Sequence, residues 1–132
     1  MDFFPLLHAT HRINGIVTLI SASATASEVE SQLRASSAVA LFTCGPLLTT
    51  ALRAARAVSI PQDAVFLLPV PGFDSGTRLS TDDLVAEAET LPPVASPSWS
   101  EGQGARQTAY LCFSSGTSGL PVRNPIPRRV YH

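Results

Sequence analysis

The chain has 132 residues, of which 45% are hydrophobic and 14% are charged, and its formal net charge is −1. This length allows one domain at most, and the apolar content is too high for a disordered chain. The small net charge excludes a general basic field for nucleic acid or an anionic membrane. No run approaches the roughly 18 apolar residues of a membrane helix. Asp2 and the short apolar patch after it do not resemble a signal peptide. We therefore expect a soluble intracellular protein, cytoplasmic by default.

The first half of the chain alternates helical patterns with apolar strand-like runs. A Ser27–Glu30 capping box is expected to open one of the helices. Such alternation is typical of a mostly parallel α/β sheet with flanking helices and right-handed crossovers. We expect the three strands of this half to be neighbours in that sheet. The predicted elements are a helix over 3–14, a strand over 16–20, a helix from Glu28, a strand over 39–43, a helix over 45–58 and a strand over 64–68.

The second half has longer irregular stretches. Residues 69–76 contain Pro and Gly breakers and are expected to form a loop. A short helix follows, capped by Ser80 and Asp83 and ended by Pro92 and Pro93. Residues 92–107 are typical of a surface linker, and residues 108–113 predict a fourth strand.

Directly after this strand come six residues that are all Ser, Thr or Gly. Glycines let the backbone approach a ligand, hydroxyls donate hydrogen bonds, and successive N–H groups in a turn can form an anion site. The stretch is not a Walker A loop, which needs a Lys after its second Gly, because the nine basic residues of the chain are all Arg. Its glycine spacing also fails the dinucleotide fingerprint and the nucleophile elbow.

Residues 114–121 read S-S-G-T-S-G-L-P. This stretch resembles the phosphate loop of adenylate-forming (AMP-binding) enzymes such as acyl-CoA synthetases and coumarate–CoA ligases, whose pattern is [ST]-S-G-[ST]-[ST]-G-x-P-K-[GA]-V. Residues 2–17 resemble an early helix-to-strand step of the same family, and residues 28–43 resemble the helix and strand that follow. The likeness covers roughly residues 2–121, which we interpret as a partial adenylation domain. Residues 122–132 are expected to be a divergent, disordered tail.

The resemblance implies a two-step reaction, in which a carboxylate is activated by ATP as an acyl-adenylate and then passed to a thiol such as coenzyme A. It implies ATP or AMP, Mg²⁺ and coenzyme A as the family's cofactors. It assigns nucleotide-phosphate binding to the six loop residues and no catalytic residue to this chain. The six residues are Ser114, Ser115, Gly116, Thr117, Ser118 and Gly119.

The sequence departs from the family after the loop, because it continues Pro121-Val122-Arg123 where the family has P-K-G. Arg123 is the nearest cation, and Arg does not replace a Lys point charge in a tight loop. The family's later motifs for adenine, ribose and the acyl group, and its second catalytic Lys, are also missing. We therefore expect a truncated ligase that binds no cofactor productively and is inactive alone. The alternatives are a small phosphate-binding module and a protein-interaction module, which would pair with itself or with a complementary ligase chain.

Other residues with chemical potential are expected to be structural. His8 and His11 are three residues apart on a predicted helix, without a third partner for a metal. Cys44 and Cys112 are each in or beside a predicted strand and are expected to be free, buried thiols. The chain thus offers no metal site, and we expect neither a nucleic-acid nor a membrane partner.

Overall fold

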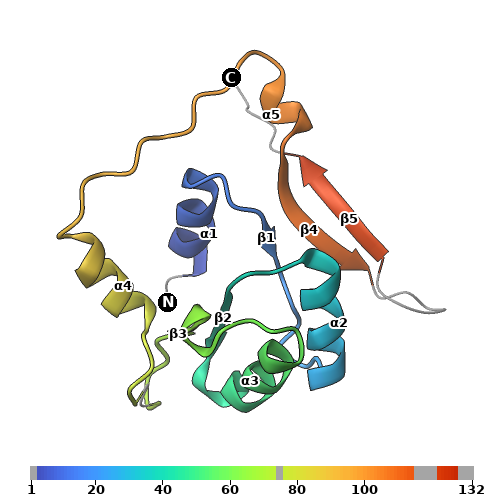
Figure 1. The fold of residues 1–132 in the computed structure, drawn as a ribbon, viewed down its shortest axis with the longest axis vertical. Helices are drawn as coiled ribbons and strands as arrows, with labels where there is room; N and C mark the ends of the chain where they lie inside the picture. Colours follow the sequence, from blue (N-terminus) through green and yellow to red (C-terminus); the bar gives the residue numbers. More distant parts are fainter. Residues whose placement is uncertain (1–2, 74–75, 115–121, 128–132) are drawn as a thin grey trace. The chain divides into compact units, whose positions relative to one another are not determined.

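A computed structural model describes residues 3–73, 76–114 and 122–127 (Figure 1). The chain divides into two compact units. The first contains Ile20–Pro93 together with Met1–Phe3, and the second contains Phe4–Leu19 and Val94–His132. Both mix helices with strands, which confirms the predicted α/β class. Among the described residues, no helix is long and apolar enough to cross a membrane.

The first unit is built on a two-stranded parallel sheet. Strand β2 (Leu41–Cys44) pairs with β3 (Val65–Leu68), so that Leu41 lies opposite Val65 and Phe42 lies opposite Phe66. Helices α2 (Ala26–Ser36) and α3 (Leu48–Ala57) lie side by side (Figure 1). The 3₁₀ turns η1 (Gly45–Leu47) and η2 (Gln62–Ala64) and helix α4 (Thr81–Ala88) complete the unit.

The core of the first unit joins these helices to the sheet. Leu33 of α2 and Val65 of β3 are its largest fully buried side chains, and each is 1% exposed. Small residues let the two helices approach closely, since Ala54 and Ala55 of α3 are also buried in the same cluster. The apolar residues that face this core recur at helical and strand spacing, which is why the sequence identified these elements.

The second unit is built on a three-stranded sheet in the order β1-β4-β5. Its strands are β1 (Val17–Thr18), β4 (Thr108–Ser114) and β5 (Val122–Pro127). Strand β1 is parallel to β4, and β5 is antiparallel to it. Helix α1 (Phe3–Arg12) belongs almost wholly to this unit, and the short helix α5 (Gln103–Arg106) precedes β4.

The predicted strand order was wrong in one respect. The strand expected over 16–20 does not neighbour the other two early strands, because β1 pairs with β4 in one sheet while β2 and β3 form another. The local apolar pattern identified each strand, but it carries no information about which distant strand supplies its hydrogen-bond partners.

The expected tail also differs from the structure. Residues 122–127 form strand β5 rather than a disordered segment, and residues 128–132 lie outside the described residues. Pro125 and Pro127, which suggested irregular structure, occupy the outer strand of the sheet, where proline is tolerated because alternate N–H groups face away from the partner strand.

Two helices begin at capping boxes. Ser80 caps α4 as predicted, and its N–H and hydroxyl both donate to Asp83 Oδ2, at 2.8 and 2.6 Å. Helix α2 begins earlier than predicted: its cap is Thr25 with Glu28, not Ser27 with Glu30. Thr25 donates to Glu28 Oε2 through its N–H at 2.7 Å and its hydroxyl at 2.8 Å. Both residue pairs fit the same S/T-x-x-E pattern, so the sequence alone does not choose between them.

We predict that Leu33→Ala lowers the free energy of unfolding of the first unit by about 2–5 kcal/mol, because it leaves a cavity in the core. Urea denaturation followed by circular dichroism measures this loss. Val39→Ala is the matched control, because Val39 is 82% exposed and should change the free energy by less than about 0.5 kcal/mol. Equal effects of the two substitutions would contradict the assigned core.

We predict that acid weakens both capping boxes. Hydrogen bonds from the Ser80 hydroxyl and N–H lower the pKa of Asp83, and those from the Thr25 N–H and hydroxyl lower the pKa of Glu28. A carboxyl whose pKa is lower in the folded state adds stability above its unfolded pKa, and this stability is lost as pH falls through the folded pKa.

The urea midpoint of the first unit should therefore fall as pH drops below the ordinary carboxyl range. It should fall less steeply in a Thr25→Ala, Ser80→Ala variant, which removes the hydroxyl donors. The measurement is a series of urea titrations across acidic pH. Identical slopes for the variant and the unmodified chain would show that these carboxylates do not contribute.

Candidate functional site

The predicted phosphate loop connects the two strands of the β4–β5 hairpin. Ser114 is the last residue of β4 and lies opposite Val122, the first residue of β5. Directly opposed residues of an antiparallel pair have Cα atoms about 4.5–5.5 Å apart, so the two ends of the 115–121 connection are neighbours. The other predicted site residues, Ser115, Gly116, Thr117, Ser118 and Gly119, lie outside the described residues. Phosphate binding by these six residues stays a prediction.

Strand β4 holds the loop on a scaffold that is paired along both edges. Val17 and Thr18 of β1 lie opposite Tyr110 and Leu111 on one side, and β5 pairs on the other. Leu111 is 3% exposed, and its carbonyl accepts a hydrogen bond of 3.0 Å from the Thr18 hydroxyl. A loop at the end of such a strand starts from a fixed point, which suits a binding role.

Thr18 is a positioning residue that the sequence analysis did not single out. Its hydroxyl fixes β4 three residues before the loop begins. A threonine within a strand is ordinary, and nothing in the local pattern signals a partner 93 residues away.

The two early histidines behave as helix-surface residues. His8 is exposed, whereas His11 is half-buried and packs edge-on against Tyr110 of β4, with ring centroids 4.8 Å apart. His11 Nδ1 also lies 3.4 Å from the Gly15 carbonyl oxygen. In the described ranges, no group of three or more His, Cys, Asp or Glu residues is placed to hold a metal ion.

Both cysteines are free, as predicted, but they are half-buried rather than fully buried. Cys44 ends β2 in the first unit, and Cys112 is on β4 in the second. Cys112 lies opposite Asn124, two pairs from the start of the loop.

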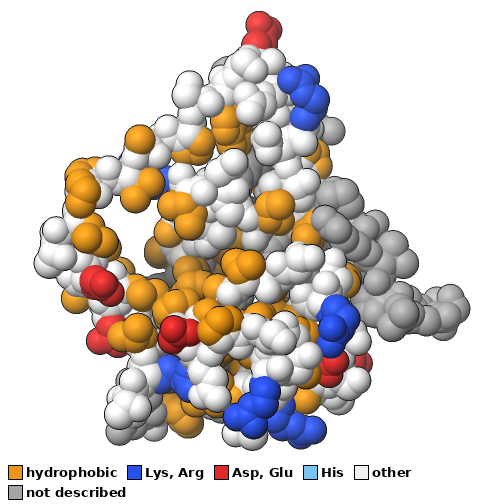
Figure 2. Space-filling model, viewed as in Figure 1, with side chains coloured by type: hydrophobic (Ala, Val, Ile, Leu, Met, Phe, Trp, Pro, Cys, Tyr) orange, Lys and Arg blue, Asp and Glu red, His pale blue; other side chains and the backbone are white. Residues whose placement is uncertain are grey.

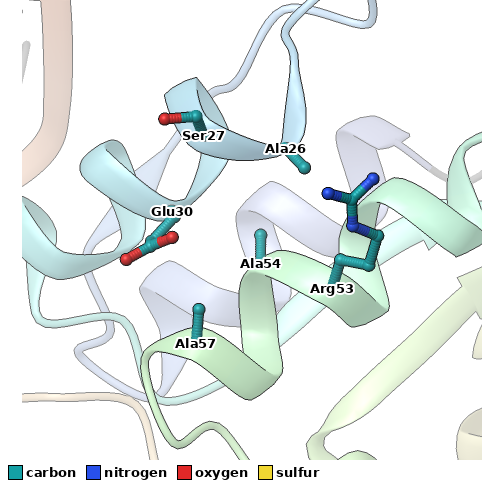
Figure 3. Close-up of a pocket in the computed structure, with 6 residues that line it drawn as sticks. All are labelled: Ala26, Ser27, Glu30, Arg53, Ala54 and Ala57. Carbon is teal, nitrogen blue, oxygen red and sulfur yellow. The ribbon is translucent and has the colours of Figure 1, made fainter.

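A shallow hollow lies between α2 and α3 of the first unit (Figure 3). Its floor is alanine, and Glu30 and Arg53 extend from the two helices at its sides. Glu30 already pairs with Arg34, at 3.0 Å between Oε1 and Nη2. Charged side chains on an exposed helix surface are usually solvated, so we assign no chemical role to this hollow. It is lined by Ala26, Ser27, Glu30, Arg53, Ala54 and Ala57.

The comparisons with known proteins agree with the loop and the fold. The family model described as "AMP-binding enzyme" matches residues 1–122. The chain is 44% identical over 123 residues to the acyl-CoA ligase AFT1-1 of Alternaria alternata, covering 90% of this chain and 21% of that protein. It is 35% identical to the acyl-CoA ligase cm3C of Cordyceps militaris, covering 90% of this chain and 20% of that protein.

Solved structures give the same fold at lower identity. A red-emitting luciferase from Phrixothrix hirtus superimposes with a TM-score of 0.77 and 21% identity, covering 97% of this chain and 30% of the luciferase. The anthranilate CoA ligase AuaEII, solved with anthranoyl-AMP, gives a TM-score of 0.72 and 20% identity, covering 92% of this chain and 22% of that one.

This chain belongs to the AMP-binding, or adenylate-forming, enzyme family. Among family members it is similar to acyl-CoA ligases, and it spans about a fifth of the length of the curated relatives that it matches. The family match includes the predicted loop and extends to Val122, the first residue of β5.

We predict that Thr18→Val lowers the free energy of unfolding of the second unit by about 0.5–1.5 kcal/mol, the usual net value of one such hydrogen bond. Urea unfolding, monitored through hydrogen exchange of the Tyr110 backbone amide, measures this loss of free energy. Thr49→Val on the exposed face of α3 is the matched control and should have little effect. An equal loss from both substitutions would show that the Thr18 hydroxyl does not hold β4.

Proposed function

We propose that this chain supplies the phosphate-loop segment of an ATP-dependent acyl-CoA ligase. One observation supports this proposal above all others: the β4–β5 hairpin closes on a connection with the family's Ser/Thr/Gly pattern, inside a segment that matches the family model. The loop residues Ser114 to Gly119 would surround the phosphates of ATP.

The chemistry of the loop suits a phosphate ligand. Four of its six residues carry hydroxyl groups and two are glycines, so it offers neutral donors and backbone N–H groups without bulky side chains. ATP supplies the activation, because a carboxylate that attacks its α-phosphate forms an acyl-adenylate and releases pyrophosphate. The loop would orient the departing pyrophosphate and stabilise its charge.

The loop has the small residues that suit a phosphate site, but it lacks the positive charge of the family's loop. The sequence contains no Lys, and Val122 stands where the family pattern has one. Neutral donors alone stabilise a growing negative charge less than donors assisted by a cation. We therefore infer that the 132-residue chain binds nucleotide phosphates weakly at most. Mg²⁺ and coenzyme A would be held by other parts of a ligase.

The 132-residue chain is also proposed to be inactive by itself. Its match to the curated ligases spans about a fifth of their length, and the motifs for adenine, ribose and the acyl group are absent from its sequence. Catalysis of this kind depends on placing ATP and the carboxylate together, and the sequence carries the loop pattern for only one of these two ligands.

Apolar side chains on the surface favour a covering partner. In the first unit, Val39, Val85 and Leu91 are each at least 60% exposed, and orange hydrophobic side chains appear at many places on the face drawn in Figure 2. Exposed apolar patches mark interfaces or sites of aggregation. We propose that the partner is a complementary ligase chain or a second copy of this one.

We predict no measurable ATP–pyrophosphate exchange by the purified chain with any carboxylic acid, because the family's loop Lys and its acyl-binding motif are missing from the sequence. The measurement is incorporation of labelled pyrophosphate into ATP. A full-length acyl-CoA ligase run in parallel shows that the assay works.

A Ser115→Ala, Gly116→Ala variant is the matched control for the loop. Carboxylate-dependent exchange above this variant would overturn the proposed inactivity. Saturable ATP binding without exchange, lost in the variant, would favour a phosphate-binding module instead.

A further inference from the structure

Gly45 is buried at the carboxyl end of β2, where η1 begins, and it lies beneath an aromatic ring. A Cβ atom at position 45 would lie 1.9 to 2.3 Å from three ring carbons of Phe73. The backbone of Gly45 does not have a positive φ, so its conformation does not require glycine. The space does: the Phe73 ring fills the notch that the missing side chain leaves.

Phe73 comes from the segment that leaves the sheet after β3. This segment, residues 69–73, is named the strap. It contains Pro69, Pro71 and Gly72, and Phe73 N–H donates to the Val70 carbonyl at 3.1 Å, so the strap turns back on itself. A Cβ at Gly72 would meet nothing within 4 Å. The backbone there stands clear of its surroundings, while the neighbouring ring reaches into the notch.

The chain is held again where it returns to β3. Leu67 N–H donates to the Leu79 carbonyl at 3.0 Å, and Leu67 bridges Ser80. Arg78 Nη1 donates to the carbonyls of Gln62 and Val65, at 2.6 and 3.1 Å. These anchors are independent of Phe73, so the strap can detach while the return remains attached.

The strap covers a part of the sheet that is chemically open. β2 and β3 are parallel, and ligands of open parallel sheets bind outside the carboxyl ends of the strands. η1 and α3 begin there without a side-chain cap at either N-terminus. The Phe73 ring is 45% exposed, so its insertion buries only part of the ring and holds the strap less firmly than the core is held.

We propose that Phe73 in the Gly45 notch is a latch, and that the strap is released from the carboxyl edge of β2 and β3 without unfolding of the first unit. Release uncovers the start of η1 and the adjoining Cys44. The latch is independent of the proposed ligase role, because it belongs to the first unit and the β4–β5 hairpin belongs to the second.

Labelling of the two free cysteines with a maleimide, read by mass spectrometry, tests the latch, because release of the strap uncovers Cys44, whereas labelling of Cys112 reports on the second unit. Phe73→Ala should raise the labelling rate of Cys44 by roughly tenfold and leave the labelling rate of Cys112 and the urea midpoint nearly unchanged. Val85→Ala, which removes a more exposed side chain from the same unit, is the matched control and should change neither rate.

Gly45→Ala provides the second arm, because its methyl group would expel the ring. It should reproduce the effect of Phe73→Ala, and Cys44 should be labelled no faster in the double variant than in either single one. If Gly45→Ala does not fold, Phe73→Ala carries the test alone. An unchanged labelling rate of Cys44 in Phe73→Ala, equal acceleration at Cys112, or additive effects in the double variant would each overturn the latch.

Discussion

The second unit depends on strand β4 having a partner strand on each side, β1 at Tyr110 and Leu111 and β5 over most of its length. A strand between two partners has its N–H and C=O groups satisfied, whereas an edge strand leaves half of them to water. β1 and β5 provide those partners, and Thr18 adds a side-chain bond to the Leu111 carbonyl. Because β4 is held in this way, the loop after Ser114 starts from a rigid strand. The chain contains no Lys, so these contacts hold β4 without the positive charge that the family's loop pattern carries.

That independence from the charge explains how the chain keeps the family's fold while departing from its loop pattern. Backbone hydrogen bonds and buried apolar residues such as Leu111 specify the hairpin. The hairpin forms with Val122 as the first residue of β5. Catalysis is more demanding, because a transition state needs charge placed within hydrogen-bond distance. The family's fold can therefore be kept in a segment whose loop pattern lacks the Lys.

The sequence predicted most elements and the parallel β2–β3 pair, but it missed the partner of β1, the short helix α5 within the expected linker, and strand β5. Leu33 and Val65 occur in patterns whose period reveals a helix and a strand, and Ser80 with Asp83 marks a helix start. The pairing of β1 with β4 had no local signal, and Pro125 and Pro127 concealed β5 because proline is excluded only from inner strands. For the candidate site, composition and spacing identified the loop, whereas Thr18 became visible only when its distant hydrogen-bond partner was known.

The second unit is discontinuous in sequence, with the first unit inserted between β1 and β4. Thr18 must find Leu111 across 93 residues, and closing a long loop costs conformational entropy before any contact repays it. The β4–β5 hairpin and the β2–β3 pair are joined by much shorter connections, so they form faster. Docking of β1 onto β4 is therefore expected to be slow, and the strand that precedes the loop gains its second partner only when two distant parts of the chain meet.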